Sequence, residues 1–189
     1  MKKVLAFSGS ARKESFNQKL VSIAAEGARQ VGVEVTVIDL ADYPMPLFNE
    51  DLEVKDGMPE TAKAFKQLLI DHDGLLIASP EYNSAFSPLL KNAIDWASRA
   101  SAKNELPLIA YRGKYAAIMA TSPGGLGGIR GLVFLRMLLG NIGITVLPDQ
   151  QAVPSAYQAF SEDGLLNDKK LESKVIGLGK ALAQELNKA

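Results

Sequence analysis

Residues 8–17 combine small hydroxyl side chains with one glycine and one arginine. They follow an apolar run at residues 4–7 that is typical of a strand, and they lead into a segment with a helical pattern. Backbone N–H groups at the start of a helix point outward, and the helix dipole favours negative charge there. Arg12 adds a planar, permanently charged donor that can bind two oxygens at once. The pattern therefore predicts a binding site for a phosphate group.

The spacing of residues in this loop narrows the kind of phosphate. A dinucleotide-binding loop places three glycines as G-x-G-x-x-G, whereas residues 8–17 contain only Gly9. The Gly-Lys-Ser/Thr ending of a nucleoside-triphosphate loop is also missing from this stretch. A terminal monophosphate therefore fits better than a pyrophosphate. The simpler alternative is a helix cap, since Ser15 and Gln18 form a capping-box pattern, and the two interpretations are compatible.

Two further loops with unusual compositions follow predicted strands. Residues 80–83 follow an apolar segment at residues 74–79, and Tyr82 offers a flat apolar face with a polar tip. Residues 121–128 follow the apolar segment 115–120 and contain four glycines within five positions, which permit positive φ and close backbone approach. Such a loop can wrap a flat ring. The alternatives are that Tyr82 packs on the next helix and that the glycines form a flexible connector.

Strand and helix patterns alternate along the chain and must position these loops. The strands are predicted at residues 3–7, 33–38, 74–79, 115–120 and 144–147, and the helices at residues 15–30, 58–72, 87–98, 128–141 and 168–187. Continuously apolar central strands indicate a parallel sheet covered by helices on both faces. The pattern predicts one α/β domain over residues 1–189, with strand order 2-1-3-4-5. In this topology the ligand crevice lies at the carboxyl ends of the strands, where the three loops meet.

The composition excludes several other classes of protein. The chain has 189 residues, of which 47% are hydrophobic, enough for one sizeable core. Lys and Arg (21) balance Asp and Glu (21), so there is no basic footprint for nucleic acid or anionic lipid. The absence of cysteine excludes disulfides, thiol catalysis and zinc–sulfur sites. His72, the only histidine, is expected to cap a helix end rather than catalyse. Without a membrane-spanning run, a cytoplasmic location is expected.

Together, the three loops resemble the NADPH-dependent FMN reductase family of flavodoxin-like proteins, which includes quinone, azo-dye and chromate reductases. The resemblance covers nearly the whole chain. It rests on three motifs, Gly9-Ser10-x-Arg12-x-x-Ser15-x-Asn17, then Pro80-Glu81-Tyr82-Asn83 with Lys91-Asn92-Ala93-Ile94-Asp95-Trp96, and finally Ser122-Pro123-Gly124-Gly125. The implied fold is the flavodoxin-like three-layer sandwich, and the implied cofactor is FMN, reduced by NADPH or NADH.

The resemblance also implies roles for individual residues. The FMN phosphate would be held by the helix amides together with Ser10, Arg12, Ser15 and Asn17, and Phe16 would lie against that end of the cofactor. The isoalloxazine ring would be lined by Pro80, Glu81, Tyr82 and Asn83, largely through backbone atoms, and bordered by Ser122, Gly124 and Gly125. No catalytic side chain and no metal are expected, because a flavin accepts hydride at its own N5. Glu81 is expected to be structural.

The implied activity is hydride transfer from NAD(P)H through FMN to a flavin, quinone, azo-dye or metal-oxyanion acceptor. The alternatives are a flavodoxin-type electron carrier and a flavin-binding regulatory domain without reductase activity. Carriers of that kind are typically acidic and bind phosphate through a threonine-rich loop without arginine. The balanced charge of this chain and the presence of Arg12 therefore count against a carrier.

Residues 40–49 predict an association surface. This connection is longer than the two to six residues usual in α/β units, and it contains several large apolar side chains and two prolines. A monomer would have to expose several of these side chains together, and contiguous apolar patches usually mark interaction surfaces. We therefore expect a homodimer or homotetramer, a state that the family resemblance also favours. The alternative is that the segment folds back over its own core.

Overall fold

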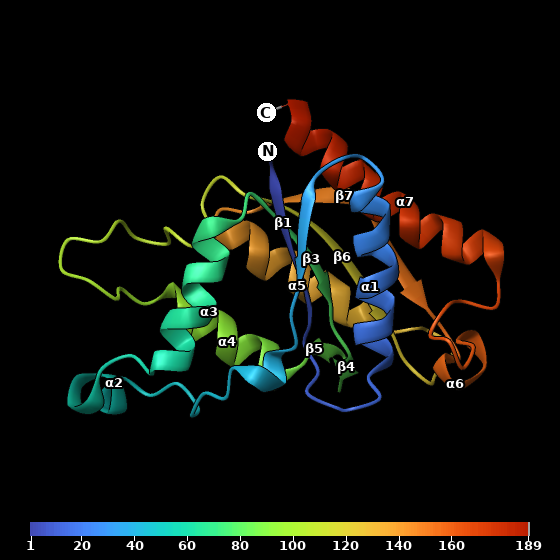
Figure 1. Ribbon diagram of the computed structural model, residues 1–189. Coiled ribbons are helices and arrows are strands. Elements are labelled where there is room, and N and C mark those ends of the chain that lie inside the picture. Colours follow the sequence, from blue (N-terminus) through green and yellow to red (C-terminus); the bar gives the residue numbers. More distant parts are fainter. Residues whose placement is uncertain (189) are drawn as a thin grey trace.

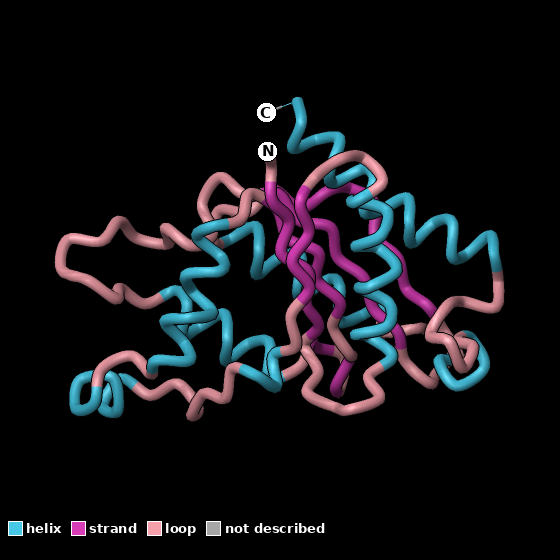
Figure 2. The backbone as a smooth tube through the Cα atoms, viewed as in Figure 1, coloured by secondary structure: helices cyan, strands magenta, loops and turns pink. Residues whose placement is uncertain are grey.

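Five parallel strands form the centre of the computed structural model, which describes residues 1–188 (Figures 1 and 2). The strand order is β2-β1-β3-β6-β7, which confirms the predicted order 2-1-3-4-5. The strands are β1 (Lys3–Ser8), β2 (Glu34–Val37), β3 (Gly74–Ala78), β6 (Tyr115–Thr121) and β7 (Thr145–Val153). Every residue of β3 is buried, as expected for a central strand that is covered on both faces.

Two layers of helices cover the sheet, and each layer closes its own apolar core (Figure 1). One face carries α1 (Phe16–Arg29) and α7 (Lys169–Lys188). The other face carries α3 (Glu60–Asp71), α4 (Pro88–Ser98) and α5 (Ile129–Asn141). The three-layer sandwich predicted from the alternating pattern is therefore confirmed. No helix within residues 1–188 has both the length and the apolar character needed to cross a membrane.

Helices α1 and α7 approach each other closely because each contributes a glycine at the crossing. A Cβ atom on Gly27 would overlap the carbonyl oxygen of Ile176, and a Cβ on Gly179 would overlap that of Ala24. The obstacles are backbone atoms, which cannot rotate away as a side chain can. The two glycines therefore set the distance between the helices that form this layer.

The structure contains four short elements that the sequence pattern does not predict. They are the 3-10 helix η1 (Leu40–Asp42), helix α2 (Glu50–Asp56), the hairpin of β4 (Glu81–Tyr82) with β5 (Ala85–Phe86), and helix α6 (Ala156–Ala159). All four lie in segments expected to be irregular. Each is short, so it gives too few residues for a periodic pattern to be recognised.

Strand β7 is longer than predicted, and the reason is Pro148. The expected strand ended at Leu147, and the next residue is a proline, which cannot donate a hydrogen bond to a neighbouring strand. The observed strand continues to Val153 because the register against β6 shifts between Ala116 and Ile118, which accommodates the proline in a bulge. A proline is tolerated here because β7 is an edge strand.

Residues 40–49 fold back onto α4, so the expectation that a monomer exposes several of their apolar side chains is wrong. The indole N–H of Trp96 donates to the carbonyl oxygen of Pro46 at 2.7 Å, and the Asn92 amide donates to the same oxygen at 2.9 Å. The Phe48 ring packs edge-on against Trp96, with centroids 5.1 Å apart. Of the large apolar side chains in this segment, Leu47 is the one left mostly exposed, at 77%.

Candidate functional site

The loops after β1, β3 and β6 meet in one pocket at the carboxyl edge of the sheet, as the topology predicts. Most of the predicted site residues line this pocket, namely Ser10, Arg12, Ser15, Phe16, Asn17, Pro80, Glu81, Tyr82 and Ser122. Three predicted residues do not line it, namely Asn83, Gly124 and Gly125. Three residues that were not predicted do line it, namely Thr121, Pro123 and Ala156.

Gly9 fixes the loop after β1 because it lies directly against the start of α4. Its N–H donates to the Ala78 carbonyl oxygen at 2.8 Å, and its own carbonyl accepts from the Ser87 hydroxyl at 2.5 Å. A Cβ at this position would lie 2.7 Å from Ser87 Oγ and 2.9 Å from Leu90 Cβ. Glycine is therefore needed here for close packing, and the loop is anchored to both β3 and α4.

The N-terminus of α1 faces the pocket with free donors. The Ser15 hydroxyl oxygen accepts from the Gln18 N–H at 3.2 Å, which confirms the predicted cap. The hydrogen bonds within residues 1–188 leave the N–H groups of Phe16 and Asn17 without a partner. The Arg12 side chain is exposed and has no ion pair among the same residues. These donors can receive a phosphate without breaking an existing bond.

Asn17 ties α1 to the end of β6. Its side-chain amide donates to the Thr121 carbonyl at 3.1 Å, and its side-chain oxygen accepts from the Thr121 N–H at 3.0 Å. The side chain is buried and already bonded at both ends. Its backbone N–H is therefore the group that Asn17 offers to the pocket, and its side chain positions the helix that carries the phosphate donors.

Glu81 supplies the cap that α5 lacks. The residue before the helix is Gly128, which has no side chain to offer. The Glu81 carboxylate accepts from the N–H groups of Arg130 (3.1 Å) and Gly131 (3.3 Å), and it pairs with the Arg130 guanidinium at 2.6 Å. Its side chain is only 7% exposed. With its oxygens occupied in this way, Glu81 holds the β4–β5 hairpin on α5, in agreement with the structural role expected for it.

The β4–β5 hairpin places Tyr82 at the rim of the pocket. Its two-residue turn has positive φ at both Asn83 (51°) and Ser84 (71°), as hairpin turns of this length usually require. Tyr82 is 50% exposed, so it is not the packing residue that the alternative interpretation describes. A flat, half-exposed ring next to the pocket can lie against a planar ligand.

The four glycines after β6 have two different roles. Gly127 and Gly128 have positive φ, 62° and 87°, and a Cβ on Gly127 would lie 2.7 Å from the Val153 carbonyl carbon. They shape the turn into α5. Gly124 and Gly125 are not among the residues with positive φ and face open space, so these two do not use the positive φ that glycine permits. Their missing side chains leave room beside the pocket.

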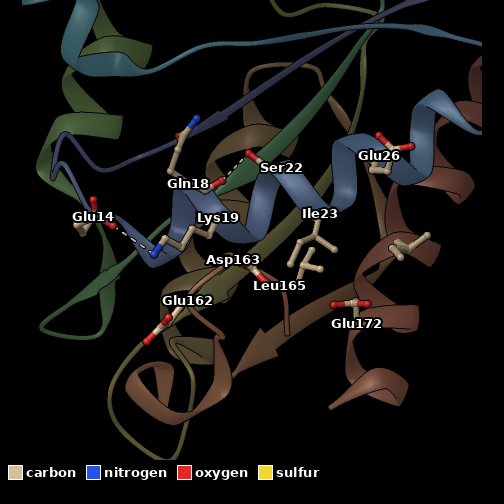
Figure 3. Close-up of a pocket in the computed structure, with 12 residues that line it drawn as sticks. Glu14, Gln18, Lys19, Ser22, Ile23, Glu26, Glu162, Asp163, Leu165 and Glu172 are labelled. Atoms are coloured by element: carbon tan, nitrogen blue, oxygen red, sulfur yellow. Dashed lines mark hydrogen bonds and ion pairs between the residues drawn. The ribbon is translucent and has the colours of Figure 1, made fainter. Parts of the chain in front are cut away.

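A second, larger cavity of about 450 Å³ lies between α1, α7 and residues 162–165 (Figure 3). Its charged lining residues are Lys19 and five carboxylates, Glu14, Glu26, Glu162, Asp163 and Glu172. Lys19 is paired with Glu14 at 3.3 Å, as the dashed line in Figure 3 marks. The excess of negative charge would repel a phosphate. The pocket beside Arg12 is therefore the candidate site for an anionic ligand.

The buried residues His72 and Lys114 do not line this pocket. Both ring nitrogens of His72 are engaged, one with the Leu68 carbonyl at 2.7 Å and the other with Thr36 Oγ1 at 2.9 Å, which confirms its role at the end of α3. Lys114 donates to the His72 carbonyl, and burial lowers the pKa of its ammonium group. The described residues contain no group of three or more His, Cys, Asp or Glu suited to a metal.

Comparison with known proteins identifies the family of the protein that carries this site. The family model for NADPH-dependent FMN reductases matches residues 2–158. The chain belongs to this family. As an FMN reductase family member it is 35% identical over 178 residues to an NADPH:quinone oxidoreductase of Arabidopsis thaliana, covering 92% of this chain and 86% of the relative. It is 37% identical over 172 residues to an NAD(P)H-dependent FMN reductase of Pseudomonas aeruginosa, covering 90% and 88%.

A solved structure supports the same assignment for this FMN reductase. The flavoenzyme NAD(P)H:(acceptor) oxidoreductase FerB from Paracoccus denitrificans aligns with a TM-score of 0.81 and 29% identity, covering 100% of this chain and 98% of that chain. The protein is thus an NAD(P)H-dependent oxidoreductase with a flavodoxin-like fold and FMN as its cofactor. The resemblance to this family is confirmed. The electron-carrier and regulatory-domain alternatives are not supported.

Proposed function

We propose that this FMN reductase passes electrons from NAD(P)H to a quinone, using FMN held in the pocket at the carboxyl edge of the sheet. The main support is that unpaired hydrogen-bond donors suited to a phosphate and an exposed aromatic ring lie in the same pocket. Quinone is favoured as the acceptor class by the relatives named as quinone oxidoreductases. FMN, when bound, supplies the redox chemistry, because it accepts hydride from a nicotinamide and then reduces the acceptor.

The phosphate of FMN would be held by the Ser10 and Ser15 hydroxyls, the Arg12 guanidinium and the N–H groups of Phe16 and Asn17. Each of these groups is a hydrogen-bond donor, and Arg12 adds a full positive charge. The dipole of α1 also favours a negative group at this end. A dianionic monophosphate fits this donor set, and the lack of a nearby carboxylate partner for Arg12 within residues 1–188 leaves its charge available.

The ring would lie along the second and third loops of the same domain, which we take as residues 1–189. Tyr82 and Pro80 would line one side, with Glu81 and Asn83 contributing mainly through the backbone. The other edge would be bordered by the exposed residues Gly124 and Gly125 and the half-buried Ser122. We assign no proton transfer to Glu81, because its carboxylate is bonded to the start of α5.

This function predicts a yellow protein that NADPH bleaches. Acid release should yield one FMN per chain, identified by chromatography. Under anaerobic conditions, NADPH should remove the flavin absorbance, and added benzoquinone should restore it. A bound flavin that neither NADPH nor NADH bleaches would instead indicate an electron carrier. The absence of flavin even after reconstitution with FMN would contradict the proposed site.

We further propose that the enzyme is a homodimer, or a homotetramer built from that dimer, in the cytoplasm, where NAD(P)H is supplied. Because residues 40–49 fold inward, a different surface supports the association. Helix α5 and the loop before it expose large apolar side chains at Leu126 (55%), Ile129 (43%), Val133 (61%), Phe134 (45%) and Met137 (66%). We call this surface the α5 face. Contiguous apolar surface of this kind usually marks an interface, and the Glu81–Arg130 ion pair joins α5 to the hairpin beside the proposed FMN site.

Val133→Glu is therefore expected to dissociate the oligomer, because a charge would be buried without a partner at the centre of the α5 face. Size exclusion with light scattering at micromolar protein should give a 20.3 kDa species for this variant and at least twice that mass for the wild type. Val54→Glu is the matched control, since Val54 is 87% exposed on α2. A wild-type protein that runs at 20.3 kDa while fully loaded with FMN would contradict the proposal.

A further inference from the structure

Ser155 has an unusual backbone conformation next to the candidate FMN site. It lies between β7 and α6 with φ 53° and ψ 49°, the left-handed region that residues with side chains seldom adopt. Within residues 1–188 its hydroxyl makes no hydrogen bond that would account for this conformation. The explanation therefore has to be sought in its backbone.

The left-handed conformation directs two N–H groups at the loop after β6. The Ser155 N–H donates to the Gly124 carbonyl at 3.2 Å, and the Ala156 N–H donates to the Ser122 carbonyl at 3.0 Å. A turn that includes such a conformation can point successive N–H groups to the same side. Both acceptors belong to residues 122–125, the segment that would border the flavin ring.

Val153 holds the same loop from the other side of Ser155. Its carbonyl oxygen accepts from the Ser122 N–H at 3.3 Å and from the Thr121 hydroxyl at 2.9 Å. Its backbone also lies against Gly127, too close for a Cβ there. Residues 153–156 therefore clamp residues 121–127 along their length. A segment this rich in glycine is otherwise flexible, so the flexible connector considered from the sequence is not what the structure contains.

We propose that Ser155 is a positioning residue for FMN: its left-handed backbone fixes residues 122–125 in the conformation that receives the edge of the flavin ring. The inference rests on the proposed FMN site. A loop that is already ordered loses less conformational entropy when the ligand binds, which increases affinity. The contribution comes from the backbone of Ser155 and not from its hydroxyl.

Two substitutions separate the backbone from the hydroxyl. Ser155→Gly removes the hydroxyl but favours positive φ. Ser155→Thr keeps the hydroxyl but disfavours positive φ, because its side chain is β-branched. Asn104→Thr is the control, since Asn104 also has positive φ (66°). Asn104 belongs to the loop between α4 and β6. Figure 1 shows this loop on the opposite side of the molecule from α6.

The first measurement is the release of FMN when the holoprotein is diluted, monitored by the fluorescence of free FMN. The second is the visible absorption spectrum of the flavin that stays bound. Ser155→Thr should raise the dissociation constant about five- to tenfold and alter the spectrum. Ser155→Gly and Asn104→Thr should stay within about twofold of the wild type. Hydrogen exchange at the Ser155 and Ala156 amides should accelerate in Ser155→Thr alone.

The opposite order of effects overturns the inference. If Ser155→Gly releases FMN and Ser155→Thr retains it, the hydroxyl is the binding group. If both retain FMN as tightly as the wild type, the clamp does not position the cofactor. A wild-type protein that binds no FMN contradicts the proposed function itself. In that case the hydrogen-exchange measurement still tests whether the left-handed backbone of Ser155 holds residues 122–125.

Discussion

Gly179→Ala is expected to destabilise the protein by at least about 3 kcal/mol, because overpacking against backbone cannot be relieved by a side-chain rotation. The added methyl group would overlap the carbonyl of Ala24 on α1. Relief requires α1 and α7 to move apart, which would loosen the apolar core that they share with the sheet. Urea unfolding, followed by circular dichroism, measures the change in the free energy of unfolding.

The control for this prediction lies two residues away on the same helix. A Cβ on Gly177 would have no neighbour within 4 Å. Gly177→Ala should therefore stabilise the protein by about 0.5–1 kcal/mol, because alanine restricts the unfolded chain and favours the helix. Equal stability of the two variants would show that α1 and α7 do not cross at the distance described.

Arg12→Ala is expected to weaken FMN binding by about 10- to 150-fold. Charge-assisted hydrogen bonds of the kind proposed between Arg12 and the phosphate contribute about 1.5–3 kcal/mol, and that free energy corresponds to this range of affinity. The stability of the protein without FMN should barely change, since Arg12 is exposed and unpaired among residues 1–188. The dissociation constant can be measured from FMN fluorescence on dilution of the holoprotein.

Lys13→Ala provides the comparison for Arg12. Lys13 is the next residue, also exposed and also cationic, but it does not line the pocket. Its removal should leave FMN affinity within about threefold of the wild type, the change expected from a screened surface charge. If the two variants lose the same affinity, the effect is one of general charge. If Arg12→Ala binds FMN like the wild type, the guanidinium does not reach the phosphate.

Local signals in the sequence predict the main elements well. Ser87 followed by Pro88 marks the start of α4, and the helix begins at Pro88 as expected. Ser15 marks the start of α1 in the same way. Once the strand order follows from the alternating pattern, the topology alone brings the three loops together. Most of the pocket could therefore be predicted without knowing any side-chain contact.

The contacts that the sequence does not reveal join residues far apart in the chain. Glu81 caps α5, a helix that begins 48 positions later. No local sequence pattern predicts this contact between the Glu81 carboxylate and the start of α5. Pro46 is held by Asn92 and Trp96, so residues 40–49 look like an exposed apolar loop until α4 is placed beside them. The hairpin turn has Ser84 at a position where glycine is usual. For that reason the sequence does not predict the hairpin of β4 and β5.

The bulge at Pro148 also affects the tendency of the protein to aggregate through the edge of its sheet. An edge strand presents unpaired N–H and C=O groups to which a strand from another molecule can add, which is a common beginning of aggregation. In β7 the proline removes one such donor, and the register shift interrupts the regular ladder. The other edge, β2, is only four residues long. Both edges of the sheet are therefore poor templates for the addition of a strand from another molecule.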